Sequence, residues 1–202
     1  MTERVMTAPP PLATADKSLW PAQGEWTYDD YVRLPDGDSR YEIIKGVLYT
    51  TPAPSFDHQY VVVELASQMR NFVVEQKLGI VLTAPFEVHL PGVARPVQPD
   101  VLYIAAERQP ARGDNFFEGA PDLVVEVLSP STMRVDRYVK FDAYERAGVR
   151  EYWLVDPRMR FVEVYARAEN GEFALMGQFR ADEQAHSQVL AGFVLETGTL
   201  FA

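Results

Sequence analysis

The chain has 202 residues, 47% of them hydrophobic and 24% charged, a composition typical of one globular domain. Its net charge of −10 argues against wholesale adhesion to nucleic acid, and the absence of cysteine excludes disulfides, thiolate metal sites and a cysteine nucleophile. No apolar run approaches the roughly 20 residues that span a bilayer, and the N-terminus lacks the apolar core of a secretory signal, so we expect a cytoplasmic protein with no membrane partner.

The first half of the chain predicts an arm, a short helix, a hairpin and a long helix. Residues 1–24 are rich in Pro, Ala and Thr and are expected to form a flexible arm before a single domain over 25–202. Thr27 can cap a short helix in TYDDYVRLP, and RYEIIKGVLYTTPA has the composition of a strand or a bulged hairpin. Apolar residues spaced at three and four predict a helix over about 57–78, which Gly79 is expected to end.

The second half predicts mostly strands. Three candidates come first, in GIVLTAPFEVHL, VQPDVLYIAA and PDLVVEVLS. A helix over about 133–147, closed by Gly148, precedes a strand in REYWLVD and a hairpin around the Asn-Gly turn of FVEVYARAENGEFALMGQFR. Because the connection over 128–150 contains a helix, the two strands that flank it are expected to be parallel. This order predicts an α/β sandwich with a mixed sheet.

Glu126 interrupts an otherwise apolar strand in PDLVVEVLSPST. With a period of two, its side chain shares one strand face with Val124 and Leu128. Burying a carboxylate is costly unless something compensates its charge, so a functional role is favoured over a structural one. The residue also lies near the carboxyl end of its strand, where open α/β sheets commonly bind ligands.

A second acid and a lysine are expected beside Glu126. Asp100 enters the strand of VQPDVLYIAA, and if the two strands are neighbours its carboxylate repels that of Glu126 unless one is protonated or a cation lies between them. Oxygen ligands without cysteine or a nearby histidine select Mg²⁺ or Mn²⁺. Lys140 shares a helix face with Asp136 and can reach the same end of the sheet, where it could orient a water or offset charge on a phosphate.

Each of these residues also has a structural interpretation. Asp136 and Lys140 fit an exposed helix salt bridge, Asp100 fits turn chemistry at a strand edge, and Glu42 in RYEIIKG fits a surface or paired residue. GxSxG, HExxH and P-loop motifs are absent from the sequence, so serine hydrolases, zinc proteases and P-loop ATPases lack their signatures. His89 and His186 fit structural or exposed positions. His58, at the start of the long helix, fits a helix cap, a packing residue or a contact to the site.

Five segments in order resemble the Uma2 family, also called DUF820, over about residues 25–200: RYEIIKG, QPDVLYI, PDLVVEVLSPST, KFDAYERAGVREYWLVDP and VEVY. That family is grouped with the PD-(D/E)XK nucleases of restriction-endonuclease-like fold. The resemblance implies a three-layer α/β sandwich with a central mixed sheet and an αβββαβ core. An additional N-terminal strand or hairpin and a C-terminal hairpin would flank this core.

The resemblance also implies site residues and an activity. The PD of the motif matches Asp100 and the proline before it, and Glu126 matches the second acid. The motif lysine would fall at Leu128, but Uma2-like sequences carry a lysine on the following helix, where Lys140 stands. Glu42 matches an acid contributed from the N-terminal side. The implied reaction is hydrolysis of DNA phosphodiester bonds, with Asp100 and Glu126 holding Mg²⁺ or Mn²⁺ and Lys140 positioning or activating water.

Two other functions stay open. The first is a non-catalytic binding or scaffold protein that retains the fold as a homodimer, which Leu128 and the acidic net charge favour. A homodimer is also expected for the nuclease, because PD-(D/E)XK proteins commonly pair to address both strands. The second is glycoside hydrolysis by two carboxylates, which needs an aromatic-lined groove and no metal and leaves the lysine unexplained.

Overall fold

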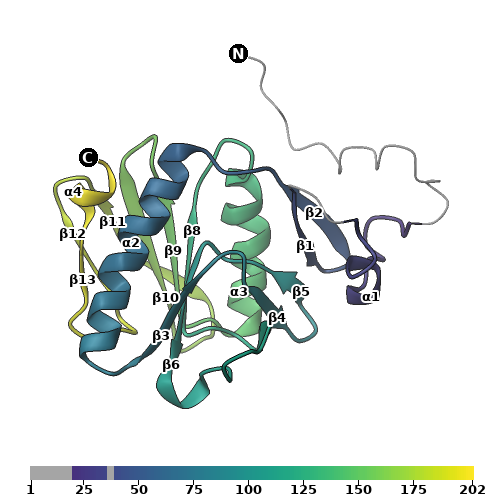
Figure 1. Ribbon diagram of the computed structural model, residues 1–202. Helices are drawn as coiled ribbons and strands as arrows, with labels where there is room; N and C mark the ends of the chain where they lie inside the picture. The colour runs from purple at the N-terminus through teal and green to yellow at the C-terminus, as the bar shows by residue number, and fades with distance from the viewer. Residues whose placement is uncertain (1–19, 36–38) are drawn as a thin grey trace.

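A six-stranded mixed sheet forms the centre of the fold. In this computed structural model, which describes residues 20–35 and 39–202, its strand order is β11-β10-β9-β8-β6-β3 (Figure 1). Strands β8 and β9 are parallel, as the helical connection predicts, and the other neighbours are antiparallel. The strands are β3 (Gly79–Thr83), β6 (Val101–Ala105), β8 (Leu123–Val127), β9 (Glu151–Asp156), β10 (Phe161–Arg167) and β11 (Phe173–Arg180).

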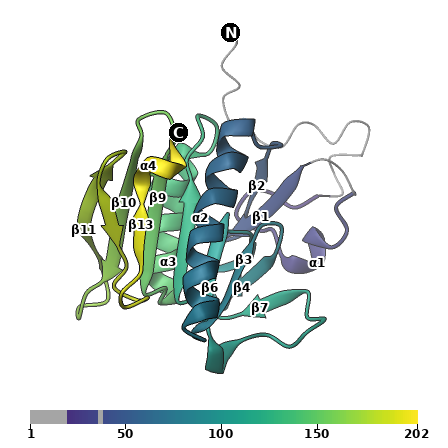
Figure 2. The same ribbon diagram turned by 60° about the vertical axis from the view of Figure 1, so that its left-hand side comes forward.

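Helices cover both faces of this sheet. Helix α2 (Phe56–Glu75) runs along one face, and α3 (Phe141–Ala147) packs on the other (Figures 1 and 2). The strand alternation follows the two layers, because Val125 packs in the α2 core whereas Val124 and Leu128 pack in the α3 core. The period-2 interpretation of β8 and the three-layer α/β sandwich are therefore confirmed.

A second sheet of five strands, in the order β2-β1-β5-β4-β7, packs its apolar residues into the α3 core. The single strand predicted from GIVLTAPFEVHL is wrong, because the segment divides into β3 and β4, which belong to different sheets. Pro85 lies between them and has no N–H to donate to a strand ladder. The strands are β1 (Arg40–Ile44), β2 (Val47–Thr51), β4 (Glu87–Leu90), β5 (Ala94–Val97) and β7 (Phe116–Glu118).

The end of α2 differs from the sequence prediction. The helix ends at Glu75, and Gly79 opens β3 instead of closing the helix. A Cβ on Gly79 would lie 2.1 Å from the carbonyl oxygen of Ile104, so the close approach of β6 requires glycine there. Gly148, in contrast, adopts the left-handed conformation that closes α3, as expected.

Residues 20–24, the part of the predicted arm that the structure describes, contact the β1–β2 hairpin. The hairpin itself was expected from the sequence. Residues 1–19 of that arm lie outside the described residues. Gln23 Oε1 accepts a hydrogen bond of 2.8 Å from the Leu48 N–H. Thr27 then caps α1 (Tyr28–Tyr31), as predicted.

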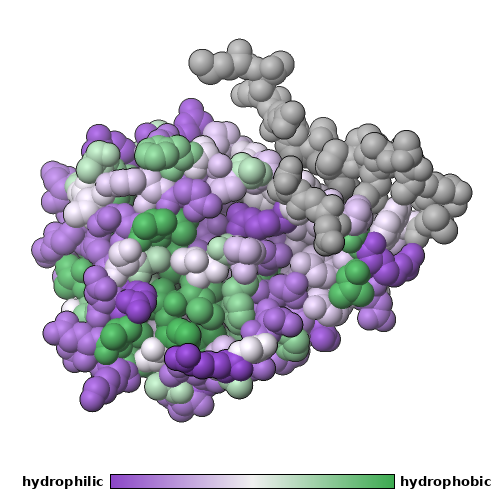
Figure 3. Space-filling view, viewed as in Figure 1, coloured by the Kyte–Doolittle hydropathy of each residue, from purple (hydrophilic) through white to green (hydrophobic). Residues whose placement is uncertain are grey.

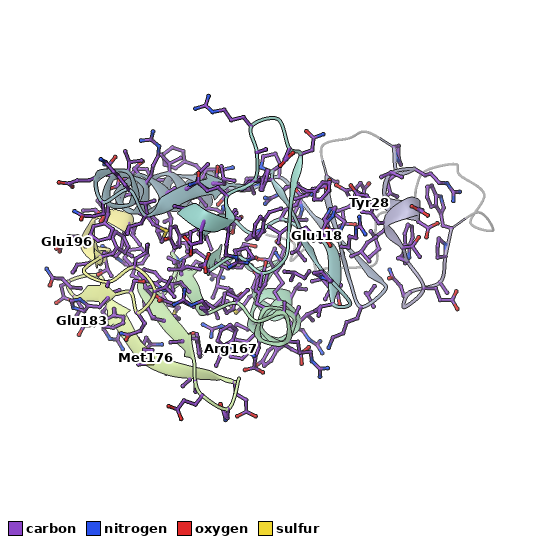
Figure 4. All side chains as sticks on the ribbon, turned by 90° about the horizontal axis from the view of Figure 1, so that it is seen from below. Tyr28, Glu118, Arg167, Met176, Glu183 and Glu196 are labelled. Carbon is purple, nitrogen blue, oxygen red and sulfur yellow. The ribbon has the colours of Figure 1, made fainter. Side chains whose placement is uncertain are left out.

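The C-terminal segment returns to the α2 face of the central sheet, where Leu190, Phe193 and Leu195 enter its core. Figure 4 places Glu183 and Glu196 of this segment toward the opposite end of the molecule from Tyr28. The remaining elements are η2 (Ala106–Arg108), β12 (Gln184–His186), β13 (Val194–Glu196) and α4 (Thr197–Leu200). No helix in the described part of the chain is long and apolar enough to cross a bilayer.

Glu151 anchors this returning segment. Its Oε2 accepts hydrogen bonds from Ser187 Oγ at 3.0 Å, Gln188 N–H at 2.8 Å and Val189 N–H at 2.7 Å. Burial raises the pKa of the Glu151 carboxyl, while these hydrogen bonds favour its charged form.

Replacing this carboxylate should loosen the C-terminal segment. We expect Glu151→Gln to lower the free energy of unfolding by about 1–3 kcal/mol. An amide oxygen in the place of Oε2 leaves its NH₂ group facing the Trp153 Nε1–H, which donates to Oε1 in the wild type, and a neutral oxygen accepts the other hydrogen bonds more weakly than a carboxylate does. Urea denaturation measures the change, and Glu169→Gln, at an exposed position of the β10–β11 turn, is the matched control. Equal unfolding midpoints for the two variants would rule out this anchoring role.

Candidate active site

A small polar cavity lies where the end of β8 meets the start of α2, the β1–β2 hairpin and the π-helical turn η3 (Val135–Lys140). Its volume is about 20 Å³, roughly the space of one water molecule. All four residues expected at the site line this one cavity. Its charged lining residues are Arg40, Glu42, Asp100, Glu126, Asp136 and Lys140.

The ammonium of Lys140 lies between carboxylates from three parts of the chain. Its Nζ is 3.0 Å from Glu126 Oε1, 3.0 Å from Glu42 Oε2 and 3.6 Å from Asp136 Oδ1. Lys140 is only 5% exposed and Glu126 only 2% exposed. The expected reach of Lys140 to Glu126 is therefore observed, whereas an exposed Asp136–Lys140 pair and a surface position for Glu42 are not.

The π-helical turn η3 carries Asp136 and Lys140 into this cavity. A π-helix holds more residues in each turn than an α-helix, and such turns occur often at functional sites. The Tyr152 hydroxyl donates to the Asp136 carbonyl oxygen at 3.0 Å, and Tyr144, on the following α3, donates to Glu126 Oε1 at 2.7 Å. Hydrogen bonds from the neighbouring strand and helix thus hold the turn and the glutamate in place.

Asp100 immediately precedes β6 and is held from both sides. Its Oδ2 accepts a hydrogen bond of 2.9 Å from the Val127 N–H, because β6 and β8 are neighbours as expected. His58 Nε2 is 3.1 Å from the same oxygen, and Arg40 Nη2 is 3.6 Å from Oδ1. Burial opposes the charged form, but the hydrogen bond and charge of His58, with Lys140 and the Val127 N–H, hold the pKa of Asp100 below its usual value.

Protonation equilibria at the cavity reflect burial and crowded negative charge. Burial raises the pKa of Glu126 well above its usual value, and the neighbouring carboxylates add to this although Lys140 opposes it. Burial likewise raises the pKa of Asp136 to about 6. Burial lowers the pKa of Lys140, but Glu126, Glu42 and the other acids outweigh it and raise that pKa well above its usual value. Lys140 is therefore an ammonium at neutral pH.

Oxygen atoms dominate the groups that could hold a cation here. Asp100 and Glu126 are the expected pair, and both line the cavity. Across residues 20–35 and 39–202, no three His, Cys, Asp or Glu side chains converge closely enough to hold a metal ion by themselves. A cation at this place would need other oxygen ligands besides the two carboxylates.

Sequence reasoning missed several residues of the site. Gln98, Arg40 and Tyr144 were not proposed, although Gln98 lies two residues before Asp100 and Tyr144 lies four residues after Lys140. These spacings were the available signals. The main-chain N–H of Gln98 donates to Glu42 at 2.7 Å, so the QPD segment positions two acids at once.

Leu128 and the histidines also have defined places. Leu128, at the position of the motif lysine, is buried in the α3 core. His58 contacts Asp100, while Ser55 caps α2. His89 is buried and stacks on Phe116 at 4.2 Å, consistent with a structural role, and His186 is exposed.

Removing the Lys140 charge should destabilise the fold in a pH-dependent way. Lys140→Met leaves several carboxylates buried without their cation, which should reduce the free energy of unfolding by about 3–5 kcal/mol at pH 7. Lys140 lowers the pKa values of Glu126 and Asp136, so both should rise further in the variant. The folded variant then takes up more protons than the folded wild type as pH falls from about 7 toward 5, and the stability loss should shrink over this range.

Urea denaturation at several pH values measures this effect. Lys45→Met is the matched control, because Lys45 pairs with Asp142 at the surface, and it should change stability by less than about 1 kcal/mol. Equal losses for the two lysine variants, or a loss that does not depend on pH, would contradict a charged cluster at Lys140.

Known proteins resemble the chain in sequence and in fold. The family model Uma2, described as "Putative restriction endonuclease", matches residues 28–198. An uncharacterised protein of Synechocystis sp., slr1290, is 24% identical over 160 residues, which cover 78% of this chain and 82% of that protein. The crystal structure of a "putative nuclease belonging to DUF820" from Anabaena variabilis has a TM-score of 0.71 and 23% identity, and the match covers 87% of this chain and 97% of that one.

The structural match supports the restriction-endonuclease-like fold, and the family match supports a nuclease-like function at a coarse level. Because the family model spans most of the sequence, the chain belongs to the Uma2 family.

Proposed function

We propose that the protein is a Mg²⁺- or Mn²⁺-dependent endonuclease that hydrolyses DNA phosphodiester bonds at the cavity of Asp100 and Glu126. One observation carries the proposal: the buried ammonium of Lys140 contacts Glu126 in a polar cavity that Asp100 also lines. Buried acids beside a lysine are the groups that phosphoryl chemistry needs for a cation and for charge stabilisation.

The donor set fits a hard divalent cation. Four acidic side chains line the cavity with two permanent cations, Lys140 and Arg40, so the acids outnumber the fixed positive charges. Mg²⁺ is usually held by one or two carboxylates and keeps several waters, which matches Asp100 and Glu126. When bound, the cation would stabilise charge on the phosphate and promote ionisation of water.

Lys140 acts in this proposal as a fixed positive charge and not as a base. Its raised pKa keeps the amine protonated at neutral pH. Nζ donates a hydrogen bond to Glu126 Oε1, while Glu42 and Asp136 are ion-pair partners at 3.0 Å and 3.6 Å. The N–H groups that Glu126 does not engage could donate to a water or a phosphate oxygen. Lys140 thereby positions the nucleophile or offsets charge in the transition state.

DNA is the proposed substrate because the family description names restriction endonucleases. The net charge of −10 means that a polyanion must be attracted locally and not by the whole surface. Arg40, which is partly exposed at the cavity beside Asp100, supplies local positive charge. Glycoside hydrolysis is disfavoured, because Tyr49 is the one Phe, Tyr or Trp side chain among the described residues that line the cavity and the buried Lys140 would have no role in that reaction.

A non-catalytic binding protein is the second candidate. Leu128, which occupies the position of the motif lysine, is buried in the α3 core, so catalysis would depend on Lys140 from a different backbone position. This departure from the motif favours the non-catalytic protein.

We propose a homodimer for either function. Helix α2 exposes Phe56, Tyr60 and Val63 at intervals of four and three, and apolar side chains also gather on the face seen in Figure 3.

A nuclease assay with a charge-neutral variant tests the activity. Wild-type protein should nick supercoiled plasmid DNA with Mg²⁺ or Mn²⁺, and a chelator should stop it. Glu126→Gln keeps the side-chain shape but removes the charge, so the nicking rate should fall roughly 100-fold or more.

The surface variant Glu169→Gln, which lies far from the cavity in sequence and is exposed, should keep the wild-type rate. If the wild-type protein is as inactive as Glu126→Gln with every metal and DNA form, the nuclease proposal is contradicted and the non-catalytic binding protein is favoured.

A further inference from the structure

Gln98 holds a buried oxygen atom that none of the described residues satisfies. The residue is 7% exposed, and its side-chain Oε1 accepts no hydrogen bond. Gln98 lines the same cavity as Asp100 and Glu126. Leaving a buried acceptor unpaired destabilises the fold, so such an atom is expected to have a hydrogen-bond donor or a cation as its partner.

The orientation of the Gln98 amide is fixed by its other end. Nε2 lies 3.4 Å from the Tyr41 carbonyl oxygen and 3.4 Å from the Tyr31 hydroxyl. A carbonyl oxygen can only accept a hydrogen bond, so the NH₂ group must face Tyr41. Turning the amide over would set two oxygen atoms against each other. Oε1 is therefore the atom left for a partner from outside the chain.

The surroundings of Gln98 define the chemistry of that partner. An acceptor oxygen needs a donor or a cation, and the four acids that line the cavity outnumber its two permanent cations. A cation that prefers oxygen ligands satisfies both conditions. Carboxylate, carbonyl and water oxygens together are the ligand set of Mg²⁺ and Mn²⁺.

We propose that the side-chain carbonyl of Gln98 is a third protein ligand of the divalent cation, together with Asp100 and Glu126. This inference rests on the proposed function, since it concerns the same cation. No three acidic or histidine side chains converge on a metal position within the described chain, so a third side-chain ligand would have to be of another residue type. A neutral amide adds a ligand without adding repulsion to the crowded carboxylates.

Metal binding without DNA tests this proposal. Binding of Mn²⁺ to the full-length protein is followed by the electron paramagnetic resonance signal of free Mn²⁺. Gln98→Met has similar length but no oxygen, and it keeps the main-chain N–H that donates to Glu42. We expect its Kd for Mn²⁺ to be at least about 10-fold weaker than that of the wild type. Gln59→Met, at an exposed position of α2, should bind as the wild type does.

Gln98→Glu is the complementary variant, because it keeps an oxygen at the place of Oε1, although its second oxygen then faces the Tyr41 carbonyl oxygen. It should keep a Kd for Mn²⁺ within about 10-fold of the wild type, and it decides the question if Gln98→Met proves to be unfolded in a thermal melt. Loss of Mn²⁺ binding by folded Gln98→Glu would overturn the ligand role, as would an unchanged Kd for folded Gln98→Met.

These failures differ from failure of the proposed function. Wild-type protein that binds no Mn²⁺ would overturn both proposals at once. Wild-type binding that Glu126→Gln abolishes and Gln98→Met leaves unchanged would remove Gln98 alone and leave the two-carboxylate site.

Discussion

The ammonium of Lys140 is the group on which the arrangement of the cavity depends. It offsets the charge of Glu42 and Glu126, each of which has a carboxylate oxygen 3.0 Å from Nζ and would be costly to bury in ionised form without a cation. These acids come from the β1–β2 hairpin and from β8, and the lysine comes from the π-helical turn. One charge therefore ties the second sheet, the central sheet and the helical layer together.

The central sheet supplies rigidity to this charge cluster. Strand β8 is flanked by β6 and β9 and is covered on both faces, so the backbone that carries Glu126 has little freedom to move. The main-chain N–H of Val127 also orients Asp100 across the β6–β8 pair. The same apolar strand that makes a buried glutamate costly thus holds the two carboxylates at a fixed separation, as a catalytic or binding site requires.

Local patterns in the sequence predicted the centre of the site but not its edges. Period-2 alternation and a helical crossover were enough to bring Asp100, Glu126 and Lys140 to one end of the sheet. Gln98 and Arg40 were missed as site residues because their roles arise from long-range packing of the hairpin, whereas a contact of His58 to the site was one of the open alternatives. The second sheet was missed for a similar reason: Pro85 breaks one apparent strand, but only tertiary contacts decide that β4 then pairs with β5 and β7.

The π-helical turn makes the position of Lys140 sensitive to the number of residues in this segment. A residue added to or removed from the turn would rotate Lys140 by about 100° relative to the rest of the helix and carry the ammonium away from the acids. Substitutions on the outer side of the turn, such as at the exposed Tyr138, leave that rotation unchanged. A change in the number of residues of this segment should therefore disturb the cavity more than a substitution at Tyr138.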